Sequence, residues 1–152
     1  MLQIDFLQYQ EQLKFKTINR KRHIWDDIRK KYIQLTPEET VRQLVIQYLI
    51  ADRNYNKNRI SIEQQLIINT LIKRCDILVY SQQTQPYLLV ECKAPNVPIS
   101  QSTFDQIAQY NLALNVSYLV VTNGLVTFCC KMDTTNQQYS FLAEIPSNNV
   151  NL

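Results

Sequence analysis

Three charged residues near the middle of the chain have types and spacing suited to chemistry on a phosphate ester. Asp76, Glu91 and Lys93 form the pattern D-x14-E-x-K within otherwise apolar sequence. Two carboxylates supply the hard oxygen ligands that suit Mg²⁺ or Mn²⁺. A metal in such a site polarises a phosphoryl oxygen and activates a bound water. Lys93, two residues after Glu91, projects from the same strand face and can orient or deprotonate that water, or stabilise charge on the phosphate.

The residues alone leave a second interpretation open. Glu91 can form a structural ion pair with Lys93 or with Arg74 at the end of a sheet. A loose D…E-x-K pattern also occurs by chance in many proteins. Charges inside apolar strands need partners in either case. The pattern therefore predicts either a metal site or a structural ion pair.

The elements that position these charges read as an antiparallel hairpin. Two runs of strand composition, Asp76–Tyr80 and Tyr87–Val90, flank a polar connector. A turn centred on the connector places Asp76 opposite Glu91, with Cβ atoms roughly 4.5–5.5 Å apart. Two like charges that close destabilise the strands unless something neutralises them. A divalent cation would do so, which favours the metal-site interpretation.

The remaining sequence predicts a mixed α/β sheet with helices on its faces. Thr36 as cap, Pro37 at the first helical position and Glu39 three residues after the cap predict a helix from about Pro37 to Ala51. A second helix is predicted within Ser100–Asn115, with Ser102 as cap and Asp105 closing a capping box. Further strands are expected over Arg59–Ile68, Ser117–Thr122 and Leu125–Met132, with a turn at Asn123–Gly124, a link at Asn69–Lys73 and an edge strand within Gln138–Ile145.

The excess positive charge lies in the first quarter of the chain. Residues 1–35 hold eight Lys/Arg and four Asp/Glu, whereas the rest hold eight and nine. The basic clusters Arg20–Lys21–Arg22 and Arg29–Lys30–Lys31 suit a polyanionic partner, although a solvated basic surface has the same composition. We expect an extended segment over Lys14–Ile24, and a helical turn or a loop over Trp25–Ile33. The predicted organisation is a basic arm at 1–35 packed on the core, a domain at 36–146 and a disordered tail at 147–152.

Composition indicates one soluble domain. The 152 residues are 45% hydrophobic and 10% aromatic, and no apolar run approaches the ~18 residues of a membrane span. The N-terminus carries acidic and Gln residues where a signal peptide is apolar, so we expect a cytoplasmic protein. Four cysteines without a CxxC pair, and one histidine, argue against structural zinc and predict buried, reduced thiols.

Several segments together resemble a known family. The sequence is similar to the N-terminal nuclease domain of type I restriction enzyme motor (R) subunits, within the PD-(D/E)xK nuclease superfamily. The resemblance implies a restriction-endonuclease-like mixed sheet flanked by helices, with an αβββαβ core in a single domain. The segments that carry it are IRKKYIQLTPEETVRQ (Ile28–Gln43), RCDILVY (Arg74–Tyr80), LLVECKAP (Leu88–Pro95), QIAQY (Gln106–Tyr110) and YLVVTNG (Tyr118–Gly124).

The resemblance also implies roles for single residues. Asp76 and Glu91 match the metal-binding carboxylates, and Lys93 matches the catalytic lysine. Gln106 and Tyr110 match a QxxxY motif, and their spacing places them on one helix face. There Gln106 would hold a metal-bound water or the DNA backbone, although a surface Gln above a packed Tyr has the same spacing. Glu39 matches an acidic position that often completes the metal site, although a capping-box role with Thr36 suits it equally and does not exclude the first. Glu63 is an acidic alternative that also suits a strand surface.

The resemblance implies a Mg²⁺-dependent DNA endonuclease, with Mn²⁺ as substitute, in restriction, defence or DNA processing. The chain has no Walker A sequence and one glycine, so we expect no ATP site in it. The basic residues Arg20, Lys21, Arg22, Lys30 and Lys31, with Tyr110, are the predicted DNA contacts. We expect DNA as a partner, with a separate restriction-system or motor subunit, and a homodimer stays open. The alternative is a non-catalytic nucleic-acid-binding or assembly module with the same fold.

Overall fold

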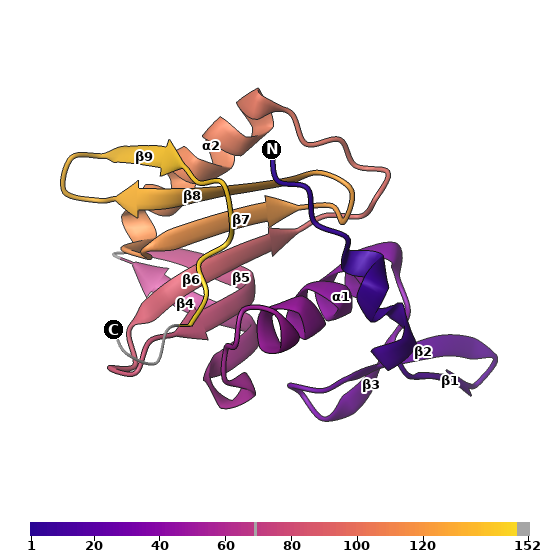
Figure 1. The fold of residues 1–152 in the computed structure, drawn as a ribbon. Helices are drawn as coiled ribbons and strands as arrows, with labels where there is room; N and C mark the ends of the chain where they lie inside the picture. The colour runs from indigo at the N-terminus through magenta and orange to yellow at the C-terminus, as the bar shows by residue number, and fades with distance from the viewer. Residues whose placement is uncertain (69, 149–152) are drawn as a thin grey trace.

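The main sheet has six strands whose order in space follows their order in the chain. The computed structural model describes residues 1–68 and 70–148 (Figure 1). Neighbouring strands are antiparallel except β6 and β7, which are parallel. The strands are β4 (Ile60–Ile68), β5 (Leu71–Tyr80), β6 (Pro86–Cys92), β7 (Tyr118–Thr122), β8 (Thr127–Asp133) and β9 (Gln138–Phe141).

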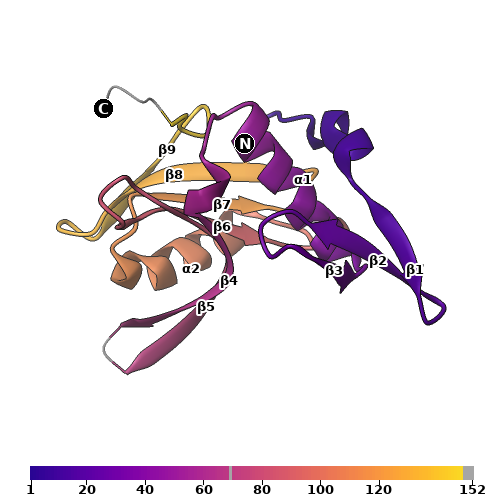
Figure 2. The same cartoon turned by 90° about the horizontal axis from the view of Figure 1, so that it is seen from below.

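One helix covers each face of this sheet (Figure 2). Helix α1 (Pro37–Ala51) packs Val45 and Leu49 against the face that carries Ile77 and Val90. Helix α2 (Gln101–Asn111), extended by the 3-10 turn η3 (Leu112–Leu114), packs on the other face. The order α1-β4-β5-β6-α2-β7 is the predicted αβββαβ core, which is therefore confirmed. No helix of the described residues is long and apolar enough to cross a membrane.

The start of α1 is confirmed, and the start of α2 differs from the prediction. Thr36 caps α1 and its hydroxyl accepts a hydrogen bond from the Glu39 backbone N–H. In α2 the cap is Ser100, whose hydroxyl accepts from the Thr103 N–H, so the assignment to Ser102 is wrong. Two serines two residues apart offer the same hydroxyl, and the sequence pattern does not separate them.

The N-terminal segment forms a second, smaller sheet beside α1 (Figure 1). The extended conformation expected over 14–24 is confirmed by its first two strands. The helical turn or loop expected over 25–33 is confirmed only for residues 27–30, because Trp25 and Asp26 end one strand and Lys31 begins the next. The Asp26 carboxylate accepts backbone N–H groups within this turn. The elements are η1 (Phe6–Gln12), β1 (Phe15–Ile18), β2 (Lys21–Asp26) and β3 (Lys31–Gln34).

Two loop predictions are also corrected. The link expected at Asn69–Lys73 is too long, because β5 already begins at Leu71. The turn after β7 takes four residues, with the Asn123 side chain accepting from two backbone N–H groups within it. In the predicted tail, Asn148 bonds to the Arg53 and Asn54 carbonyls, while 149–152 lie outside the described residues. All four cysteines are buried and unbridged, as expected.

Candidate metal and DNA site

The hairpin register brings Asp76 and Glu91 to the open end of the β5–β6 ladder. Ile77 pairs with Val90, as predicted, and Asp76 and Glu91 follow directly after this pair. The Asp76 carboxylate accepts a hydrogen bond from the Cys92 backbone N–H at 2.7 Å. Burial raises the pKa of Glu91, and the neighbouring Asp76 charge raises it further. The two carboxylates therefore lie together, as the charge pattern predicted.

Glu91 opens into a hollow of about 200 Å³ between the sheet and α2. Lys93, Gln106 and Tyr110 line the same hollow. No ion pair in the described part of the chain engages the Lys93 side chain, while its backbone N–H donates to the Thr122 carbonyl. The structure thus gathers Glu91 and three further predicted site residues around one space.

Lys73 also lines this hollow, although the sequence pattern did not single it out. Its Nζ lies 2.8 Å from Glu91 Oε1 and 5.1 Å from the centroid of the Tyr110 ring. Burial acts to lower the pKa of Lys73, but the contact with Glu91 outweighs it and raises that pKa. Lys73 therefore supplies the positive charge that balances Glu91.

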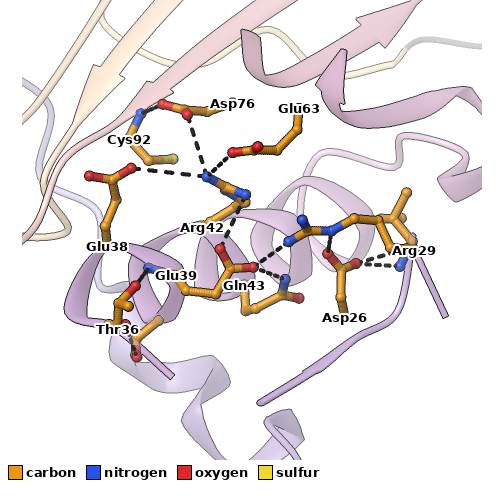
Figure 3. Close-up of polar contacts among 12 residues, drawn as sticks. Asp26, Arg29, Thr36, Glu38, Glu39, Arg42, Gln43, Glu63, Asp76 and Cys92 are labelled. Carbon is orange, nitrogen blue, oxygen red and sulfur yellow. Dashed lines mark hydrogen bonds and ion pairs between the residues drawn. The ribbon is translucent and has the colours of Figure 1, made fainter. Parts of the chain in front are cut away.

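Arg42 of α1 balances Asp76 in the same way (Figure 3). Its side chain is only 5% exposed, with Nη1 3.1 Å from Glu39 Oε2 and Nη2 3.4 Å from Asp76 Oδ1. Nη2 also lies 3.0 Å from Glu63 Oε1 and 4.0 Å from Glu38 Oε1. Burial acts to lower the pKa of Arg42, but the Coulombic effect of Glu39, then Asp76 and Glu63, outweighs it and raises that pKa. Arg42 and Lys73 therefore supply positive charge beside the two carboxylates, although Arg42 is shared among four of them, so a divalent cation is not the only source of positive charge there.

Glu39 lies on the far side of Arg42 from Asp76. Its Oε1 accepts from Arg29 Nη2 at 2.6 Å and from Gln43 Nε2 at 3.2 Å, and its Oε2 faces Arg42. Its side chain therefore does not complete the capping box that the sequence suggested. Among the described contacts none joins Glu39 directly to Asp76.

Glu63, the acidic alternative, contacts the same Arg42 nitrogen as Asp76, whereas Glu39 contacts the other nitrogen. It shares Arg42 Nη2 with Asp76 and also lies 3.4 Å from Arg74 Nη1. Glu63 interrupts the β4–β5 pairing in a left-handed conformation with φ of 57°, which turns its carboxylate toward Arg42.

The donor chemistry of Asp76 and Glu91 fits Mg²⁺ or Mn²⁺. Across residues 1–68 and 70–148 no group of three or more His, Cys, Asp or Glu side chains is arranged to hold a metal. Mg²⁺ is commonly bound by one or two carboxylates, with waters and substrate phosphates completing the shell. Two adjacent carboxylates beside an open hollow match that mode, and Glu39 is not needed for it.

The predicted DNA contacts of the N-terminal segment lie on the small sheet. Arg20 and Lys21 are at the β1–β2 turn, and Arg22 stacks over the Phe15 ring at 5.0 Å. Lys30 pairs with Asp27 at 3.3 Å in the β2–β3 turn. Lys31 begins β3 and is exposed. These basic side chains are separate from the hollow that holds Tyr110.

Arg42 and Lys73 are the residues that sequence reasoning missed. Arg42 follows Val41 within the apolar stripe of α1, and a charged residue beside buried positions is a signal that it needs partners. Lys73 was hidden because its segment was assigned to a link. Starting the predicted strand three residues before Asp76 would have placed Lys73 on a strand beside the site.

Two solved structures resemble this chain. One is the fragment structure of a presumed HsdR subunit of a type I restriction enzyme from Vibrio vulnificus YJ016, with 22% identity and a TM-score of 0.48; the match covers 74% of this chain and 24% of that one. This chain therefore spans about a quarter of that protein's length. The other is a presumed nuclease of the DUF820 group from Anabaena variabilis ATCC 29413, with 12% identity and a TM-score of 0.43, covering 93% and 86% of the two chains. No curated protein matches the chain.

A family model matches most of the domain. The model described as "Type I restriction enzyme R protein N terminus (HSDR_N)" matches residues 37–146. The matched span runs from the start of α1 past the end of β9, and it contains Asp76, Glu91, Lys93 and Gln106. The match covers more than half of the 152 residues. The chain therefore belongs to the family of type I restriction enzyme R protein N-termini.

Proposed function

We propose that this chain hydrolyses phosphodiester bonds in DNA in a reaction that depends on Mg²⁺, with Mn²⁺ as a substitute. The observation that carries the proposal is the pairing of Asp76 and Glu91 beside a hollow that also contains Lys93 and Gln106. Membership of a restriction enzyme family supports DNA as the substrate.

Each residue of the site has a distinct role in this proposal. Asp76 and Glu91 hold the metal, which when bound supplies Lewis-acid activation of a phosphoryl oxygen. Lys93, whose ammonium is not taken by an ion pair among the described residues, orients or deprotonates the attacking water, or stabilises charge on the phosphate. Gln106 holds a water or the DNA backbone across the hollow.

The basic side chains of the small sheet provide sequence-independent affinity. Arg20, Lys21, Arg22 and Lys31 contact phosphates, which sets register and salt dependence but reads no bases. A separate restriction-system subunit and a second copy of the chain are further proposed partners.

One observation favours a second candidate, a non-catalytic nucleic-acid-binding or assembly module. Arg42 and Lys73 already contact the two carboxylates, so each carboxylate has an ionic partner without a bound metal. A chain with this role binds DNA but leaves its backbone intact.

Nicking of supercoiled plasmid separates the two candidates. We expect the wild-type chain to nick in Mg²⁺ or Mn²⁺ and to stop on chelation. Asp76→Asn and Lys93→Met should each lose about 100-fold or more in rate, the scale of acid–base and electrostatic contributions. Arg53→Met is the matched control, because Arg53 pairs with Asp52 and Glu144 away from the site. Wild-type DNA binding without nicking in either metal would establish the second candidate.

A further inference from the structure

We propose that Arg42 is a positioning residue for Asp76, and that the small N-terminal sheet keeps Arg42 in place through Arg29 and Glu39. The five side chains Asp26, Arg29, Glu39, Arg42 and Asp76 alternate in charge from β2 to β5 (Figure 3). Only the metal-binding arm of the test below rests on the proposed function.

The first link is inside the small sheet. Asp26 is fully buried at the end of β2, and its Oδ1 accepts the backbone N–H groups of Ile28 at 2.8 Å and Arg29 at 3.0 Å. Its Oδ2 accepts from Arg29 Nε. The turn and the guanidinium are therefore fixed by one carboxylate, because charge-assisted hydrogen bonds in a buried setting are strong and directional.

The second link crosses from the small sheet to α1. Arg29 Nη2 lies 2.6 Å from Glu39 Oε1, and Glu39 Oε2 lies 3.1 Å from Arg42 Nη1. Gln43, one turn further along α1, donates to the same Oε1. Both oxygens of Glu39 are therefore engaged, and its side chain is only 7% exposed. This arrangement assigns Glu39 to positioning Arg42 in place of binding the metal.

The third link reaches the site. Arg42 Nη2 contacts Asp76 Oδ1, and Asp76 Oδ2 accepts the Cys92 N–H. The Nε of Arg42 is buried without a hydrogen-bond partner in the described structure. The guanidinium is therefore oriented by the carboxylates around its two Nη atoms. Loss of the contact between Glu39 and Arg42 would let the guanidinium shift, and the Asp76 carboxylate would shift with it.

Hydrogen exchange of the Cys92 amide tests this link without any metal or substrate. We expect Arg29→Met and Arg42→Lys to accelerate Cys92 exchange about tenfold or more relative to the Val90 amide of the same strand, the scale for losing a charge-assisted hydrogen bond. The Val90 amide corrects for overall destabilisation. Arg53→Met is the control, because it removes an arginine that is as buried as Arg29 (20% and 21% exposed) and lies outside the network. Equal acceleration of Cys92 and Val90 in the Arg29 and Arg42 variants would overturn the proposal.

Mn²⁺ affinity gives a second readout in which electrostatics and positioning have opposite signs. Arg29→Met removes a positive charge, so electrostatics alone would tighten cation binding. If Glu39 were a metal ligand, freeing it from Arg29 would also tighten binding. Positioning predicts weaker binding, by about 10–100-fold, the scale for residues that orient metal ligands. Tighter or unchanged Mn²⁺ binding in Arg29→Met would contradict the proposal. If the wild type binds no Mn²⁺ and nicks no DNA, the proposed function fails while the exchange experiment still decides the role of Arg42.

Discussion

Each carboxylate of the candidate site contacts a buried or half-buried cation, and Arg42 is shared with Glu38, Glu39 and Glu63. Asp76 contacts Arg42 and Glu91 contacts Lys73, from helix α1 and strand β5 respectively. Removing a positive partner in such a setting leaves a desolvated charge, which costs about 3–5 kcal/mol when the pair is fully buried. The protonation of Glu91 therefore affects the stability of the fold, and pH is a direct probe of this group.

The raised pKa of Glu91 predicts a specific pH dependence of stability. Burial first, and then Asp76, raise this pKa above its ordinary 4.5, with Lys73 acting in the opposite direction. The folded chain thus keeps the proton to higher pH than the unfolded chain. The stability from this group is complete below pH 4.5 and is lost as pH rises through the raised pKa. Each unit of upward shift corresponds to about 1.4 kcal/mol.

Urea unfolding of wild type and Glu91→Gln across this pH range measures the effect. The free energy of unfolding of the wild type should fall relative to Glu91→Gln as pH rises above 4.5. Glu144→Gln, an exposed glutamate in an ion pair with Arg53, serves as the control. Parallel pH profiles for wild type and Glu91→Gln would show that Glu91 titrates normally in the folded chain.

At the residue scale, sequence spacing located the acids and missed their partners. The D-x14-E-x-K pattern and the hairpin register brought Asp76 and Glu91 together, because strand pairing is set by local sequence. Which cation reaches each acid depends on how α1 crosses the sheet and on where β5 begins. Arg42 is 34 residues from Asp76 in the chain, and no local rule connects them.

The elements around the site depend on short-range signals that can be tested singly. Thr36 accepts the Glu39 N–H at 3.0 Å and so starts α1 at the turn that carries Glu39 and Arg42. Thr36→Ala should lower the free energy of unfolding by about 1 kcal/mol, the usual cost of losing an N-cap hydroxyl. Thr36→Ser retains the hydroxyl and should remain within a few tenths of wild type. Chemical denaturation of the three proteins gives the comparison, and equal losses in both variants would assign the effect to packing of the Thr36 methyl group.

At the element scale, prediction succeeded where several local signals agreed. The bounds of α1 match because cap, proline and apolar spacing point to the same helix. The α2 cap was misplaced between two serines, and β3 was missed because the Asp26 turn resembles a helical start. The β4–β5 hairpin extends past the core, where Ile67 and Ile72 are exposed. The start of β5 is therefore not set by packing against the core, which is the kind of signal that a hydrophobic pattern reports.

For the whole molecule, the small basic sheet and the main sheet have separate proposed tasks. In the proposed function, the sheet of β1–β3 would carry the phosphate contacts and the six-stranded sheet would carry the hydrolytic site. Replacing Arg20, Lys21 and Arg22 together by alanine should weaken binding to duplex DNA of any sequence. The slope of log K against log salt should become shallower by about 0.9 for each phosphate that the variant no longer neutralises.

A salt titration of DNA binding measures that slope. Lys131→Ala is the control, because Lys131 is an exposed lysine on β8 of the main sheet. Lys131→Ala removes one charge, and its change in the salt slope should be smaller than one third of the change in the triple variant. An unchanged salt slope in the triple variant would place the DNA contacts elsewhere.

The arrangement of the small sheet on the domain was beyond prediction from sequence. Charge counts indicated a basic arm, but its contact with α1 depends on the ion pair of Arg29 with Glu39 and on the packing of Phe6 against Tyr48. These contacts form between segments that local patterns treat separately. The main sheet was predictable because its strands follow one another along the chain.

Binding of Mn²⁺ to the wild-type chain and to Asp76→Asn tests the central proposal, that Asp76 and Glu91 share one divalent cation. Titration followed by the signal of free Mn²⁺ should show one site in the wild type and in Arg53→Met, and an affinity at least about tenfold weaker in Asp76→Asn. Mg²⁺ should displace the bound Mn²⁺. Equal Mn²⁺ affinity in wild type and Asp76→Asn, or no saturable binding to the wild type, would contradict the proposed site.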